Sequence, residues 1–184
     1  MKNIVFVTVL ILAFLLIGCG KKVEEPRVEK TSDTTYKLIL NDSYVDALAR
    51  FLETYPQLKL VTKTEYPPDK DVLEYFKKGD MQYPYFAWGD FNKDGYTDFC
   101  CLFVTKINDA GYYSHWWVVV FEGAKNGEFQ YKVITNQIVA SYVNGIMYHQ
   151  KNNSVEFSAI GKAAGQFHWD GQKYVVENPG LGGD

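Results

Sequence analysis

The chain has 184 residues, a formal net charge of -3 and 16% aromatic residues, with 14 tyrosines among them. A slightly acidic chain of this kind is not expected to bind nucleic acid, and its length suits one domain with a sizeable core. The many tyrosines are typical of half-buried strands, where the ring packs and the hydroxyl reaches water.

Residues 1–18 have the layout of a signal peptide. Lys2 gives a positive start, and the apolar run from Ile4 to Ile17 is broken only by Thr8. The run is shorter than the roughly 20 apolar residues that a membrane span needs, and this order of features is that of a removable leader. An uncleaved membrane anchor is the alternative.

The apolar run ends in the box Leu16-Ile17-Gly18-Cys19. This box resembles the lipobox of bacterial lipoproteins, in which the cysteine thiol receives a diacylglycerol and the chain is cut just before it. The resemblance implies lipidation of Cys19, with a further acyl group such as palmitate on the new amino group. Two or three chains anchor a protein stably, because each buried CH₂ adds ~0.8 kcal/mol. The protein is then expected at the bacterial cell envelope outside the cytoplasm, with Gly20 pointing to the outer membrane in a Gram-negative cell.

Residues 19–35 are expected to form the lipidated cysteine and a flexible tether. The segment is charged and has almost no large apolar side chains, so it is predicted to stay solvated. A single folded domain is expected over residues 36–184, beginning near Tyr36.

Two helices are expected at the start of this domain. Residues 41–43 offer N-caps, Pro56 ends the first helix, and apolar residues lie between them at helical spacing: Tyr44, Val45, Leu48, Phe51, Leu52 and Tyr55. A second helix is expected over residues 69–78, because two prolines precede it and Lys77-Lys78-Gly79 suits a helix end.

After Gly79 the sequence pattern changes from helical spacing to that of β-strands. Residues rich in β-branched and aromatic side chains predict strands over 83–88, 99–105, 115–122, 128–135, 138–142, 154–160, 165–169 and 172–177. Asn126-Gly127, Asn144-Gly145 and Asp170-Gly171 suit type I′ turns between antiparallel strands. The predicted fold class is α+β, with two N-terminal helices packed on a mainly antiparallel β-sheet.

Two pairs of neighbouring identical residues, Cys100-Cys101 and Trp116-Trp117, lie within these predicted strands. Successive strand side chains point to opposite faces, so Cys100 and Cys101 are expected to be buried free thiols on opposite sides of a strand. A strained vicinal disulfide is the alternative. Trp116 and Trp117 should likewise divide between the two faces, with one ring buried and the other covering the sheet or serving as a contact residue.

One segment, GDFNKDGYTD, carries oxygen ligands at regular spacing. Side-chain oxygens stand at alternate positions and again at the ninth: Asp90, Asn92, Asp94 and Asp98. Calcium takes about six to eight oxygen ligands, and a curled loop can direct alternate side chains inward. Gly95 allows the sharp reversal, and the Tyr96 backbone carbonyl fills the seventh position. An ordinary Asp-Gly turn is the alternative.

The first half of this segment resembles the helix-loop-helix calcium motif, but Cys101 stands where that motif needs a glutamate. The segment as a whole resembles the short calcium loop of FG-GAP and VCBS-type extracellular repeats. That resemblance implies one structural Ca²⁺. It does not imply the propeller of that family, because only one copy is present.

These features favour a surface-tethered binding or interaction module that is not an enzyme. Its partners would be the membrane, through the lipid anchor, and a protein, glycan or envelope component as ligand. An inhibitor or immunity-type lipoprotein that protects the envelope is a narrower version. A hydrolase of an envelope polymer is the weaker alternative, because nothing in the sequence brings together two of its possible carboxylates: Asp109, Glu122, Glu128 and Glu156. The histidines also lack zinc-binding spacing: His115, His149 and His168.

Overall fold

The computed structural model describes residues 23–31, 36–62, 82–105, 114–140, 143–159 and 162–177. The predicted signal peptide, Cys19 and the predicted helix over residues 69–78 lie outside these ranges. Among the described residues, no helix is both long and apolar enough to cross a membrane.

The described part of the chain holds one helix and a series of antiparallel strands. The helix is α2 (Asp42–Thr54). The strands are β1 (Arg27–Lys30), β2 (Tyr36–Ile39), β3 (Leu58–Leu60), β4 (Phe86–Gly89), β5 (Asp98–Thr105), β6 (Ser114–Gly123), β7 (Phe129–Ala140), β8 (Val143–His149), β9 (Ser154–Ala159), β10 (Lys162–Trp169) and β11 (Tyr174–Glu177).

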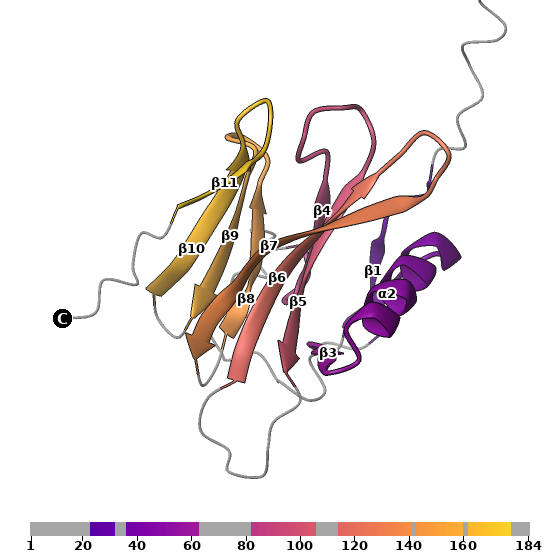
Figure 1. Ribbon diagram of the computed structural model, residues 1–184. Helices are drawn as coiled ribbons and strands as arrows, with labels where there is room; N and C mark the ends of the chain where they lie inside the picture. Colours follow the sequence, from indigo (N-terminus) through magenta and orange to yellow (C-terminus); the bar gives the residue numbers. More distant parts are fainter. Residues whose placement is uncertain are drawn as a thin grey trace, which may run out of the picture.

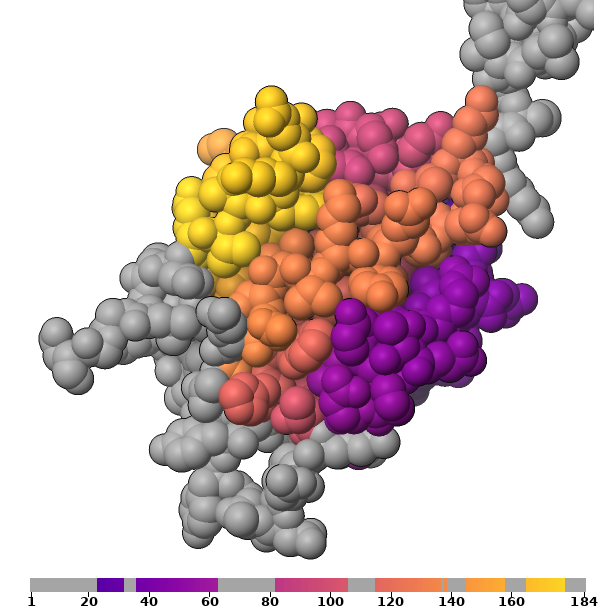
Figure 2. Space-filling view, viewed as in Figure 1, coloured from indigo at the N-terminus to yellow at the C-terminus, as the bar shows by residue number. Residues whose placement is uncertain are grey.

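These strands form three sheets that build a layered domain. A five-stranded sheet has the order β3-β5-β6-β7, with β4 also paired to β5. A four-stranded sheet has the order β11-β10-β9-β8, and β1 pairs with β2. Helix α2 lies on one side of the five-stranded sheet and the four-stranded sheet on the other (Figure 1). Figure 2 shows the same order on the surface, with β7 between the C-terminal hairpin and the helix.

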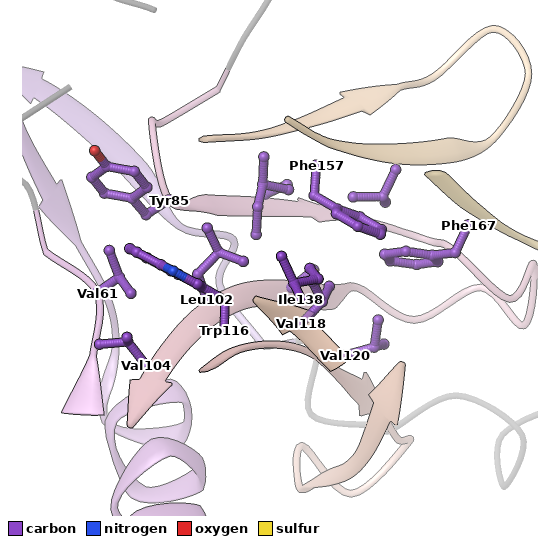
Figure 3. Close-up of a cluster of buried hydrophobic side chains, with 14 of the residues drawn as sticks. Val61, Tyr85, Leu102, Val104, Trp116, Val118, Val120, Ile138, Phe157 and Phe167 are labelled. Atoms are coloured by element: carbon purple, nitrogen blue, oxygen red, sulfur yellow. The ribbon is translucent and has the colours of Figure 1, made fainter. Parts of the chain in front are cut away.

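Strand β5 divides the core between these layers. Its side chains alternate, so Cys100, Leu102 and Val104 face the four-stranded sheet, whereas Phe99, Cys101 and Phe103 face the helix. On the first side, Phe157 and Phe167 of the four-stranded sheet lie beside valines of β6 (Figure 3). Because every residue from 98 to 104 is buried, the strand reads as a continuous apolar run, as expected for a sheet covered on both faces.

Helix α2 forms where its sequence pattern predicts. The Asn41 side chain accepts a hydrogen bond from the Ser43 N–H at 3.0 Å and caps the first turn. Buried residues lie on one face, as the apolar spacing requires: Tyr44, Ala47, Leu48 and Phe51. The Phe51 ring packs on Phe103 with centroids 4.6 Å apart. The first helix is therefore confirmed, whereas Val45, which the apolar spacing assigned to the buried face, is exposed.

The predicted fold class is wrong. Within the described ranges a single helix follows the β1–β2 hairpin and precedes the two larger sheets, and the strands divide into separate sheets instead of one. The physical reason is that β8 to β11 have an apolar face of their own, with Val155, Phe157 and Phe167 buried. That face packs against the five-stranded sheet, so the molecule is a mainly β domain with one helix as an outer layer. The antiparallel pairing itself was predicted correctly.

Part of the predicted tether belongs to the folded domain. Arg27–Lys30 form β1 and pair with Tyr36–Ile39. Pro26 is buried, Val23 packs against the helix-side core, and the Asn41 side chain donates to the Glu24 carbonyl at 2.8 Å. Folded structure thus begins before Tyr36, because backbone pairing and a few apolar contacts outweigh the charged composition.

Other predictions are corrected in detail. The predicted turn Asn144-Gly145 lies inside β8, where Gly145 pairs with Ser158. The two strands predicted over 128–135 and 138–142 are one continuous strand, β7. Strands β1, β2, β3 and β8 were not predicted. The hairpin of β10 and β11 is confirmed, with Gly171 at the positive φ of 102° that its turn requires.

Candidate calcium-binding loop

The predicted calcium loop joins β4 to β5 at residues 90–97, at the edge of the five-stranded sheet. Two of its residues have positive φ, 62° at Lys93 and 88° at Gly95. Glycine adopts this conformation without a steric cost, so Gly95 occupies the reversal that the motif assigns to it.

Three of the predicted ligands turn into the loop. The two carboxylate oxygens of Asp90 accept the N–H groups of Asp94 and Gly95, each at 3.0 Å. The Asn92 Oδ1 accepts the Asp94 N–H at 3.1 Å, and its Nδ2 donates to Asp94 Oδ2 at 3.0 Å. Asp94 Oδ1 accepts the Tyr96 N–H at 2.9 Å. Asp90, Asn92 and Asp94 are therefore brought together by one hydrogen-bonded network.

The fourth side chain, Asp98, has a different environment. It is completely buried, and its Oδ2 accepts the N–H groups of Phe91 and Asn92 at 2.9 and 3.3 Å. Its Oδ1 accepts the Gly123 N–H at 2.9 Å. Asp98 thus ties the loop to the end of β6, a role that the motif did not predict.

Burial raises the pKa of Asp98 from 3.8 to about 7, because an ionised carboxylate loses its hydration there. The backbone N–H groups of Gly123, Phe91 and Asn92 oppose the shift, since they favour the ionised form, while the nearby negative charge of Asp94 adds to it. A cation at the loop would favour the ionised form.

The network of side-chain oxygens does not include Asp98, because both of its carboxylate oxygens accept from backbone donors. The Tyr96 side chain is exposed, with 36% of its surface accessible. Among the described residues, no group of three or more His, Cys, Asp or Glu side chains is placed to hold a metal ion. The cluster consists of the half-buried Asp90 carboxylate, the exposed Asp94 carboxylate and the Asn92 amide, and no described basic side chain forms an ion pair with them.

The loop is also held by residues that the motif did not indicate. The Phe91 ring is buried between the sheets and packs edge-on against Tyr148, with centroids 5.0 Å apart. Asn153 donates from Nδ2 to the Phe91 carbonyl at 2.7 Å. These partners come from β8 and the turn after it, which nothing in the local sequence of the loop could indicate.

The three described carboxylates considered for hydrolysis each have a partner that is not another carboxylate. Glu122 binds Lys132 at 2.7 Å, Glu128 accepts from the Asn126 amide at 2.7 Å, and Glu156 lies 3.1 Å from His149. Asp109 lies outside the described residues. His168 lies 3.7 Å from Glu177, and His115 is exposed.

An apolar groove of about 450 Å³ opens between the β1–β2 hairpin, β3 and the segment leading into β4. Its walls are mainly aliphatic and aromatic: Leu38, Leu40, Leu60, Val61, Tyr83, Tyr85 and Phe86. The groove borders both ends of residues 63–81, which lie outside the described ranges.

No family model, no curated protein and no solved structure matches this chain.

Proposed function

We propose that this protein is a lipid-anchored, extracytoplasmic binding module of the bacterial cell envelope, with one structural calcium ion in the loop between β4 and β5. The box that ends in Cys19 supports the anchor. The observation that supports the calcium site is the hydrogen-bonded network that brings together Asp90, Asn92 and Asp94, three of the side chains predicted as ligands.

The chemistry of the network suits a hard cation. Each carboxylate oxygen has about two lone pairs, so the oxygens of Asp90 and Asp94 can accept their N–H bonds and still coordinate an ion. The same N–H bonds fix the oxygens in place before the ion arrives. A divalent cation would also relieve the repulsion between these two carboxylates, with the Asn92 and Tyr96 oxygens and Asp98 or water completing the shell.

Calorimetry on the full chain tests the calcium site. Wild type is expected to bind CaCl₂, with a dissociation constant as weak as ~10⁻⁴–10⁻³ M for an extracellular site of this kind. Magnesium should bind less well, because it demands a smaller octahedral shell. Asp90→Asn and Asp94→Asn should abolish the heat of binding.

Asp170→Asn is the matched control, because Asp170 also lies in an Asp-Gly turn and accepts two backbone N–H groups. No binding by wild type, or equal loss in the control, would contradict the calcium site.

Labelled fatty acid tests the anchor. Wild type should incorporate the label and Cys19→Ser should not, because the thiol is the acceptor. Cys100→Ser serves as the control, since Cys100 is a fully buried free thiol and its loss should leave the label unchanged. Equal incorporation by Cys19→Ser and wild type would refute the lipoprotein proposal.

Incubation with isolated cell-wall and membrane fractions separates the two function classes. A binding module should be retained by one fraction in a saturable manner and release no fragments from it. Soluble fragments that appear in proportion to the amount of chain would favour the hydrolase, and no retention by any fraction would contradict the binding role.

A further inference from the structure

The turn between β8 and β9 makes the contact that links the four-stranded sheet to the loop. Asn153 ends this turn and donates from Nδ2 to the Phe91 carbonyl at 2.7 Å. The Tyr148 hydroxyl donates to Asn153 Oδ1 at 2.7 Å. Tyr148 belongs to the four-stranded sheet and Asn153 to the turn after it, whereas Phe91 follows β4 of the five-stranded sheet. The hydrogen-bonded relay from Tyr148 through Asn153 to Phe91 therefore crosses between the layers.

The backbone and the hydroxyl together fix the Asn153 amide. Its φ is 54°, a left-handed conformation in which asparagine is several-fold enriched among non-glycine residues. Because the Phe91 carbonyl can only accept, the NH₂ group must face the loop, and Oδ1 is then the atom that accepts from the Tyr148 hydroxyl. Asparagine thus supplies both the conformation and a directed donor.

Phe91 is the residue on which the relay acts. Its carbonyl accepts from Asn153, its N–H donates to Asp98 Oδ2 at 2.9 Å, and its ring is buried. The peptide units before and after Phe91 are therefore both held. These units carry Asp90 on one side and Asn92 on the other, so the relay sets the directions from which both predicted ligands project.

We propose that Asn153 is a positioning residue for the calcium loop, with Tyr148 orienting its amide, and that ion binding is thereby coupled to the packing of the four-stranded sheet. This inference rests on the calcium site proposed above. Coupling between two equilibria is reciprocal: calcium in the loop should tighten the β8–β9 hairpin, and loss of the relay should weaken calcium binding.

Two variants of the full chain isolate the relay. Asn153→Gly keeps the left-handed backbone accessible and removes the amide. Tyr148→Phe keeps the ring that packs on Phe91 and removes the hydroxyl. Asn152→Gly is the matched control, because Asn152 lies in the same turn but its side chain accepts from Ser154 at 3.0 Å, away from the loop.

The test measures CaCl₂ affinity by calorimetry, melting in chelator, and hydrogen exchange at β8 and β9 amides with and without calcium. Outer partners of metal ligands typically contribute ~10–100-fold in affinity, so we expect about 10-fold weaker binding for Asn153→Gly and Tyr148→Phe. The control should stay within about twofold of wild type on the same scale. Calcium should slow exchange in the hairpin of wild type and control, and this effect should vanish in Asn153→Gly.

The outcomes separate the two proposals. If wild type binds calcium and both relay variants bind it equally well, the positioning role is overturned while the calcium site stands. If the variants melt earlier in chelator but keep wild-type affinity, Asn153 is only a structural contact, and the coupling is again overturned. If wild type binds no calcium, the calcium site and this inference both fail.

Discussion

The buried carboxyl of Asp98 should make the stability of the domain depend on pH. Its pKa is about 7 in the folded chain, because burial disfavours the charge, against 3.8 as the ordinary value. Between these two values the folded chain keeps a proton that the unfolded chain has released. Unfolding then releases a proton, so the free energy of unfolding falls as pH rises through this interval and is flat above it.

The size of the effect follows from the interval. One pKa unit corresponds to about 1.4 kcal/mol, so the interval sets an upper bound of about 4 kcal/mol. Three backbone N–H groups already solvate the ionised form. We therefore expect about 2–4 kcal/mol to be lost between pH 4 and pH 8 in the absence of calcium.

Urea unfolding in chelator at half-unit steps from pH 4 to pH 8 measures this loss. The slope should be much smaller in Asp98→Asn, which cannot ionise. Wild-type stability that is constant or rises with pH would refute the reasoning, as would a wild-type slope in Asp98→Asn.

Four further outcomes are expected. Limited proteolysis should stop near Val23 and leave β1 attached, and a core that begins at β2 would contradict the observed pairing. Tyr44→Phe should raise the free energy of unfolding by about 1 kcal/mol in urea, because no described group bonds its buried hydroxyl; a loss would indicate an unseen partner. Gly123→Ala should cost more than about 2 kcal/mol, since a Cβ there would meet the Thr97 carbonyl. Millimolar calcium should add ~1.4 kcal/mol at a dissociation constant of ~0.1 mM, which raises the melting temperature by roughly 2–4 °C per kcal/mol; sodium at matched ionic strength should not, and Asp90→Asn should remove the shift.

Local patterns in the sequence predicted the parts of the fold that depend on local rules. The alternation along β5 correctly placed Cys100 and Cys101 on opposite faces as buried free thiols. The same rule predicted that Trp116 and Trp117 divide between the two faces. In the structure Trp116 is the buried ring, and Trp117 packs against the helix-side core, where it covers the sheet. The capped apolar stripe of α2 needed no tertiary information.

Features that depend on distant partners were missed. The charged composition of the segment containing β1 predicts a tether, but pairing with β2 and contacts with the helix-side core order it. The local sequence Asn144-Gly145 predicts a turn, because both residues favour positive φ. In the structure this stretch pairs with β9 instead. The partners that hold the candidate loop, Gly123 and Asn153, lie 25 and 62 residues from their contacts, too far for any local pattern to indicate.

The two neighbouring free thiols of β5 can report separately on the opening of the two sides of the central sheet. Cys100 and Cys101 are adjacent and fully buried, yet one faces the four-stranded sheet and the other faces the helix. Burial also raises the pKa of both thiols well above the usual range, so neither reacts until its own layer opens. Thiol labelling of Cys100→Ala and Cys101→Ala would therefore time the detachment of each layer separately, and would show whether the sheet or the helix leaves the central strands first.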